Sequence, residues 1–75
     1  YDILSEIIQK ENRETVAVAL SKVKDTNQTV LRMRLIADMS YKEIAQCLQM
    51  NVSTVRSRYA RGLLQLRELC KDIRE

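Results

Sequence analysis

The sequence predicts an all-α fold, a small bundle of four to five helices that contains a helix-turn-helix. The chain of 75 residues has no proline and a single glycine, Gly62. Helix breakers are therefore almost absent, and β-hairpins would lack their usual turn residues. Three tyrosines are the only aromatic residues, so the core must be aliphatic. This length predicts one domain, residues 1–75, with little room for an enclosed catalytic cavity.

The N-terminal part of the chain carries two apolar segments separated by a polar run. Asp2 can cap a first helix, in which apolar residues 3, 4, 7 and 8 recur at helical spacing. Residues 10–14 are polar throughout. They form either a solvated helical stretch or a break at which Asn12 caps a new helix. The apolar stripe resumes at Val16 and continues to Val23.

Cap-forming residues predict the boundaries of the next helices. Residues 25–27 (Asp-Thr-Asn) can cap a helix whose apolar residues lie within 30–36. Residues 38–40 form the next boundary. Ser40 and Glu43 then make the pattern Ser-x-x-Glu, in which two side chains satisfy free N–H groups at the start of a helix.

Two helices after this boundary predict a helix-turn-helix at about residues 41–71. The first is short and places Ala45 where two helices must approach closely. Residues 49–52 form a connection of about four residues. Ser53 can cap the last helix, which runs from about residue 54 to about residue 72. In such a pair the second helix projects its outer face into the major groove of DNA.

The last helix has an apolar side and a polar side. At about 100° per residue, Val55 and Tyr59 turn inward, whereas Ser57 and Arg61 turn outward. From residue 44 to residue 67 the chain has four arginines and no acid. Guanidinium groups form hydrogen bonds with guanine edges or with phosphates, and hydroxyl groups can form hydrogen bonds with bases or phosphates. This pattern favours DNA binding, and the alternative is an ordinary helix pair with a solvated basic surface.

Two motifs of the helix-turn-helix resemble region 4.2 of bacterial sigma factors, especially the extracytoplasmic-function group. They are Ser-Tyr-Lys-Glu-Ile-Ala at residues 40–45 and Thr-Val-Arg-Ser-Arg at residues 54–58. The similarity is firm over about residues 25–70 and loose over residues 1–24. It implies a sigma-70 type region 4 domain that acts in transcription initiation in the cytoplasm. Such a domain reads the upstream, minus 35, element of double-stranded promoter DNA and docks on the β flap of RNA polymerase. In many members of the family an anti-sigma protein binds the same domain.

The resemblance also implies which residues bind DNA. Arg56, Ser57 and Arg61 match positions that contact bases or phosphates, and Arg58 matches one with a phosphate or supporting role. The remaining candidates would contact the DNA backbone. The full set of candidates is Lys42, Ser53, Thr54, Arg56, Ser57, Arg58 and Arg61.

Three positions depart from the family pattern and indicate a divergent member. Gln49 stands where the family usually has glycine, because the turn there adopts a positive φ. A left-handed glutamine costs on the order of 1 kcal/mol. Gly62 replaces a common alanine, which costs up to about 1 kcal/mol unless close packing requires it. Lys24 stands near the place of a usual proline, so that Asp25 and Asn27 would cap the helix that follows.

Two other functions share parts of this pattern. A LuxR-type regulator has the same Glu-Ile-Ala and Thr-Val elements, but it typically carries histidine where this chain has Arg58, and it tends to dimerise. A protein-interaction module would use the apolar residues of the first segment and Leu64 to bind a partner such as an anti-sigma protein. The simpler interpretation is that the first segment closes the bundle's own core. Its apolar residues are Ile3, Leu4, Ile7 and Ile8.

The composition argues against an enzyme, a cofactor or metal site and a membrane protein. The chain has no histidine and no glycine-rich phosphate loop. Cys47 and Cys70 match no zinc-binding spacing, and we expect two reduced, partly buried thiols. No apolar run of membrane-spanning length and no signal peptide occurs. The chain begins with Tyr1 rather than methionine, which is typical of a fragment of a longer protein.

Overall fold

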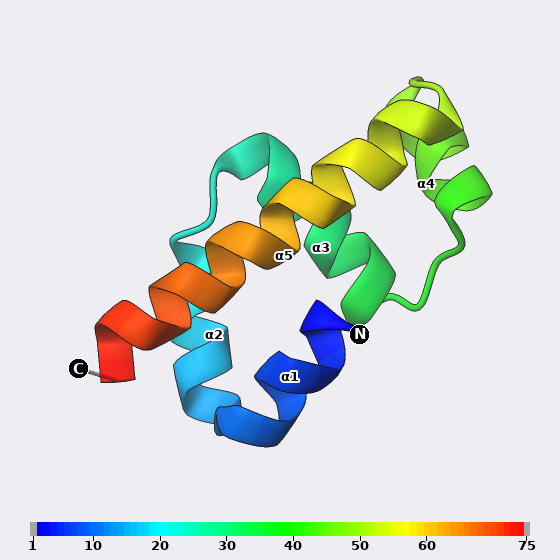
Figure 1. Cartoon of the computed structure of the whole chain (residues 1–75). Coiled ribbons are helices and arrows are strands. Elements are labelled where there is room, and N and C mark those ends of the chain that lie inside the picture. The colour runs from blue at the N-terminus through cyan, green and yellow to red at the C-terminus, as the bar shows by residue number, and fades with distance from the viewer. Residues whose placement is uncertain (1, 75) are drawn as a thin grey trace.

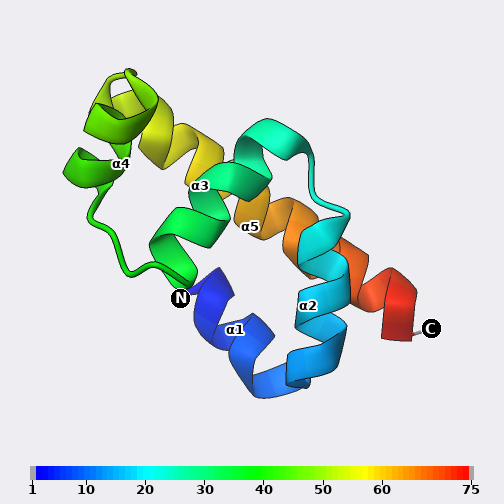
Figure 2. The ribbon, with the colours of Figure 1, turned by 180° about the vertical axis from the view of Figure 1, so that it is seen from behind.

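The fold is a bundle of short helices arranged along one long helix, as the all-α prediction requires. The computed structural model describes the backbone of residues 2–74 and the side chains of residues 2–73. Its helices are α1 (Ile3–Lys10), α2 (Arg13–Ser21), α3 (Asp25–Leu35), α4 (Tyr41–Leu48) and α5 (Val52–Arg74). Figure 1 shows α4 beside the start of α5, α3 crossing its middle, and α1 and α2 beside its C-terminal half, and Figure 2 shows the same order from behind.

Side-chain caps define the two N-terminal helices. The Asp2 carboxylate accepts a hydrogen bond from the N–H of Leu4 at 3.1 Å, which confirms the predicted first cap. The side-chain oxygen of Asn12 accepts from the N–H of Thr15 at 2.8 Å. Of the two alternatives for residues 10–14, the break with a new cap is therefore the one that the structure contains.

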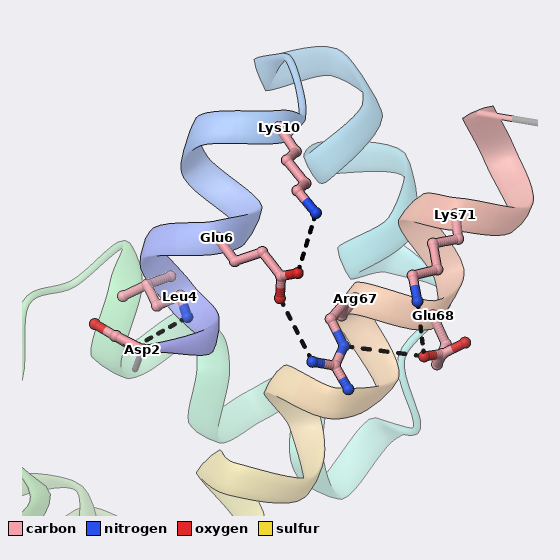
Figure 3. A network of polar contacts seen from close by, with 7 residues as sticks. All are labelled: Asp2, Leu4, Glu6, Lys10, Arg67, Glu68 and Lys71. Atoms are coloured by element: carbon pink, nitrogen blue, oxygen red, sulfur yellow. Dashed lines mark hydrogen bonds and ion pairs between the residues drawn. The ribbon is translucent and has the colours of Figure 1, made fainter.

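Helix α1 contacts α5 through one buried residue and a small ion-pair network. Ile7 is buried in a core that includes residues of α5. The carboxylate of Glu6 receives the guanidinium of Arg67 at 3.4 Å and the ammonium of Lys10 at 3.3 Å (Figure 3). Three of the four apolar residues of α1 pack against this core, and Ile8 is left 66% exposed. The first segment thus mainly closes the bundle's own core.

The start of α3 differs from the prediction. Lys24 occupies the cap position and makes no side-chain cap hydrogen bond. Asp25 is already the first helical residue, and Asn27 is 6% exposed and donates to the side-chain oxygen of Gln65 on α5 at 3.2 Å. The prediction that Asp25 and Asn27 cap this helix is wrong, because the Asn27 side chain is used in the contact between α3 and α5.

The structure has two aliphatic cores, and residues of both α3 and α5 contribute to each of them. The larger joins α1, α2, α3 and the second half of α5 around residues such as Leu31 and Leu66. The smaller supports α4 and the start of α5, and we call it the helix-turn-helix core. It consists of Val30, Ile44, Ala45 and Val55, with Leu48, Met50 and Val52 half-buried around it.

The cysteines differ from the expectation of partial burial. Cys70 is buried, Cys47 is exposed, and neither forms a disulfide. Within the part of the chain that the structure describes, no three metal-ligating side chains come together. No helix of that part combines the length and the apolar character needed to cross a bilayer.

Candidate nucleic-acid interface

The capping box at the start of α4 fixes the first helix of the motif. The Ser40 hydroxyl accepts from the N–H of Glu43 at 3.1 Å, and the Glu43 carboxylate accepts from the N–H of Ser40 at 2.9 Å. The bond from the Ser40 N–H, and then the bond with its side chain, lower the pKa of Glu43 below its ordinary value. The predicted Ser-x-x-Glu box is confirmed, and it fixes where α4 begins.

The turn between α4 and α5 contains the strain that the sequence predicted. Gln49 has φ 56° and ψ 48°, the left-handed conformation for which glycine is usual. The N–H of Met50 donates to the carbonyl of Ala45 at 3.0 Å and closes the turn. The connection has three residues, 49–51, rather than about four.

Asn51 caps α5, so the prediction that Ser53 does so is wrong. Its side-chain oxygen accepts from the N–H of Thr54 at 3.1 Å. The same oxygen accepts from the hydroxyls of Ser53 at 3.1 Å and of Thr54 at 2.6 Å. Asparagine is among the best N-cap residues, and α5 accordingly begins at Val52 and continues to Arg74. Both hydroxyls are thereby oriented at the first turn of the helix.

Five of the seven candidate residues line one shallow depression on the outer face of α5. They carry only hydroxyl and guanidinium groups: Ser53, Thr54, Ser57, Arg58 and Arg61. Ser57 and Arg61 are exposed and Arg58 is half-buried. Among residues 2–73, each ion pair lies elsewhere, so no carboxylate is within 4.0 Å of either arginine. Uncompensated cations beside hydroxyls form a surface suited to a polyanion.

The other two candidates, Lys42 and Arg56, do not line this depression. Lys42 is exposed on the first turn of α4. Arg56 is also exposed, and its guanidinium carbon lies 5.5 Å from the centroid of the Tyr41 ring. Arg56 therefore lies on the α4 side of α5, and it does not line the depression that Ser57 and Arg61 line.

An aromatic and cationic cluster surrounds Tyr41. The guanidinium carbon of Arg34, on α3, lies 5.2 Å from the centroid of the Tyr41 ring. Tyr59 meets the same ring edge-on, with centroids 5.6 Å apart and planes at 67°. Burial, and to a lesser extent Tyr41, raises the pKa of Tyr59 above its ordinary value.

Two further basic residues adjoin the site, and the sequence did not identify them as DNA-binding candidates. Lys24, at the start of α3, lines a second depression together with Arg58 and Arg61. Arg34 reaches the site from the end of α3 through Tyr41. Both are far from the last helix in sequence, and no local pattern indicates that they meet it.

A known protein family matches the part of the chain that carries this surface. The family described as "Sigma-70, region 4" matches residues 19–68, from the end of α2 through most of α5. The RNA polymerase sigma factor YlaC of Bacillus subtilis (strain 168) is 37% identical over 62 residues, which is 83% of this chain. The chain spans 36% of the length of that relative. No solved structure gave a significant match. Since the family match covers two thirds of the residues, the chain belongs to the sigma-70 region 4 family.

Proposed function

We propose that this chain recognises promoter DNA in transcription initiation, reading the upstream, minus 35, element with α5 in the major groove. The observation that carries the proposal is the outer face of α5, where hydroxyl and guanidinium groups gather without a carboxylate. Membership of the sigma-70 region 4 family supports it. In this proposal residues 1–75 form one region 4 domain that works in the cytoplasm, with the helix-turn-helix at about residues 41–71.

Different candidates take different parts of this task. Ser57 and Arg61 are exposed, line the depression on the outer face of α5 and would reach base edges. Lys42 and the hydroxyls of Ser53 and Thr54 would fix the register of α5 on phosphates. A small monomeric domain buries little surface on DNA, so we expect it to bind weakly alone and to depend on a larger complex for affinity.

The docking site that we propose for RNA polymerase is an apolar groove of about 480 Å³ formed by α1, α2, the end of α3 and Leu66 of α5. Ile8 and Ile36 line it and are 66% and 67% exposed. None of its lining residues is a DNA-binding candidate, so both surfaces can be used at once. Exposed apolar grooves of this kind accept the apolar face of a partner helix. We assign the groove to the β flap, and an anti-sigma protein would compete for it.

Selection from a randomised duplex pool at two salt concentrations tests the DNA-binding part. We expect one short, non-palindromic sequence to be enriched, with affinity that falls steeply as salt rises. A palindromic sequence would instead indicate a dimeric, LuxR-type regulator, which the family match does not favour. If no sequence is enriched, the protein-interaction module becomes the better account.

A further inference from the structure

Three helices of the domain meet at the ring of Tyr41. Tyr41 is the first residue of α4, is half-buried, and packs against the helix-turn-helix core. Arg34 from α3 and Arg56 from α5 each place a guanidinium within 5.5 Å of its ring centroid. The ring is thus the common contact of two cations that lie 22 positions apart in the sequence.

The two guanidinium groups differ in what else holds them. Arg34 donates to the carbonyl of Met39 at 3.3 Å and lies 3.9 Å from the carboxylate of Asp38. That carboxylate is 97% exposed, so solvent weakens its effect. For Arg56, no carboxylate among residues 2–73 lies within 4.0 Å. The negative face of the Tyr41 ring is therefore the contact that holds the Arg56 charge beside α4.

Two cations at one ring repel each other, and an anion bound between them would offset that repulsion. Guanidinium forks bind phosphate through paired hydrogen bonds, and a single phosphodiester group can receive two of them. The capping box of α4 already engages the N–H groups of Ser40 and Glu43. Those two N–H groups are therefore not free to bind an anion, and Arg34 and Arg56 supply the guanidinium donors at the ring.

We infer that Tyr41 is a positioning residue that holds Arg34 and Arg56 together as a paired site for one phosphate of the DNA backbone. Arg56 then contacts the backbone, and the reading of bases is left to the depression around Ser57 and Arg61. This inference rests on the proposed function, because it assigns a role within the same DNA complex.

A double-mutant cycle on the 75-residue chain tests the role of the ring. The probe is a short labelled duplex of mixed sequence at low salt, and binding is followed by fluorescence anisotropy. We expect Tyr41→Leu to weaken binding by about two- to fivefold, the range of an exposed cation–π contact. Tyr41→Phe, which keeps the ring, should bind as the wild type does. In an Arg56→Ala background, Tyr41→Leu should have a clearly smaller effect. Circular dichroism of each variant checks that the helices remain folded.

The shared phosphate is tested by a second cycle, which leaves the helix-turn-helix core untouched. If Arg34 and Arg56 bind the same phosphate, the loss in Arg34→Ala combined with Arg56→Ala differs from the product of the single losses. Strictly multiplicative losses would overturn the shared site.

Three outcomes would overturn the role of the ring. They are a Tyr41→Leu variant that binds as the wild type, a Tyr41→Phe variant as weak as Tyr41→Leu, and an undiminished effect of Tyr41→Leu in the Arg56→Ala background. A wild-type chain that binds no duplex would overturn the proposed function and this inference with it. If the wild type binds and Arg61→Ala weakens binding, while Tyr41→Leu changes nothing, this inference alone fails.

Discussion

Gly62 on α5 lies directly against Leu31 on α3. A Cβ atom on residue 62 would be 3.0 Å from both Cγ and Cδ1 of that leucine. Leu31 is completely buried, so its side chain has little room to move. The glycine inside α5 therefore allows the close crossing of α3 and α5, which in turn fixes how α5 is presented.

Replacing this glycine should destabilise the fold although alanine is the better helix former. Helix propensity favours Gly62→Ala by about 1 kcal/mol, whereas overpacking a tight core costs about 1–3 kcal/mol. We expect the free energy of unfolding to fall by about 1 kcal/mol on balance, measured by urea unfolding. Ala60→Gly, at an exposed position of the same helix, measures the propensity term alone. A Gly62→Ala variant more stable than the wild type would show that the contact with Leu31 is not tight.

The capping box should make stability depend on pH through Glu43. Hydrogen bonds with Ser40 lower the pKa of Glu43 below its ordinary value of 4.5. The resulting stabilisation is complete above the unfolded pKa and is lost as the pH falls through the lower, folded pKa. The thermal midpoints of the wild type and Glu43→Gln should therefore converge as the pH is lowered below 4.5. A difference that stays constant down to strongly acidic pH would contradict this role of the carboxylate.

Contacts with bases and with phosphates should respond differently to mutation. Arg61→Ala should weaken binding to the selected duplex by about 1–3 kcal/mol and relax sequence preference, if its contact is bidentate to a base. Lys42→Ala should weaken binding similarly on all sequences and reduce the slope of log affinity against log salt by about 0.9. The control is Lys71→Ala, which removes the same charge near the C-terminal end of α5. Equal losses in the Lys42 and Lys71 variants would mean that net charge, not location, governs binding.

The apolar groove should be needed for polymerase docking and not for DNA binding. Ile36→Asp places a charge in the groove and removes an exposed apolar contact, so binding to the isolated β flap should weaken by about tenfold. Val18→Asp is the matched control, because Val18 is 46% exposed and does not line the groove. Duplex binding of both variants should be unchanged. Equal flap binding by the two variants would place the docking site elsewhere.

Features set by local chemistry were predictable from the sequence. The Ser40 and Glu43 box, the Asp2 cap and the left-handed turn at Gln49 all occur as expected. Each depends on residues within one turn of one another, where residue type nearly determines the hydrogen bond. The division of α5 into a buried and an exposed side was also predictable, because helical periodicity alone places Val55 inside and Ser57 outside.

Features set by competition or by tertiary contacts were not predictable. Asn51 and Ser53 are both good caps, and only the path of the turn shows that Asn51 is used. Asn27 looked like a cap, but it is buried against α5. The same limit applies to the interface, since the contact of Arg56 with Tyr41 depends on how α4 crosses α5.

The most direct test of the central claim, that the outer face of α5 reads base edges, is to repeat the randomised-pool selection with Arg61→Ala and Ser57→Ala. We expect the wild type to enrich one short, non-palindromic sequence and each variant to lose preference at particular positions of it. If both variants enrich the wild-type sequence unchanged, then α5 does not read DNA through this face.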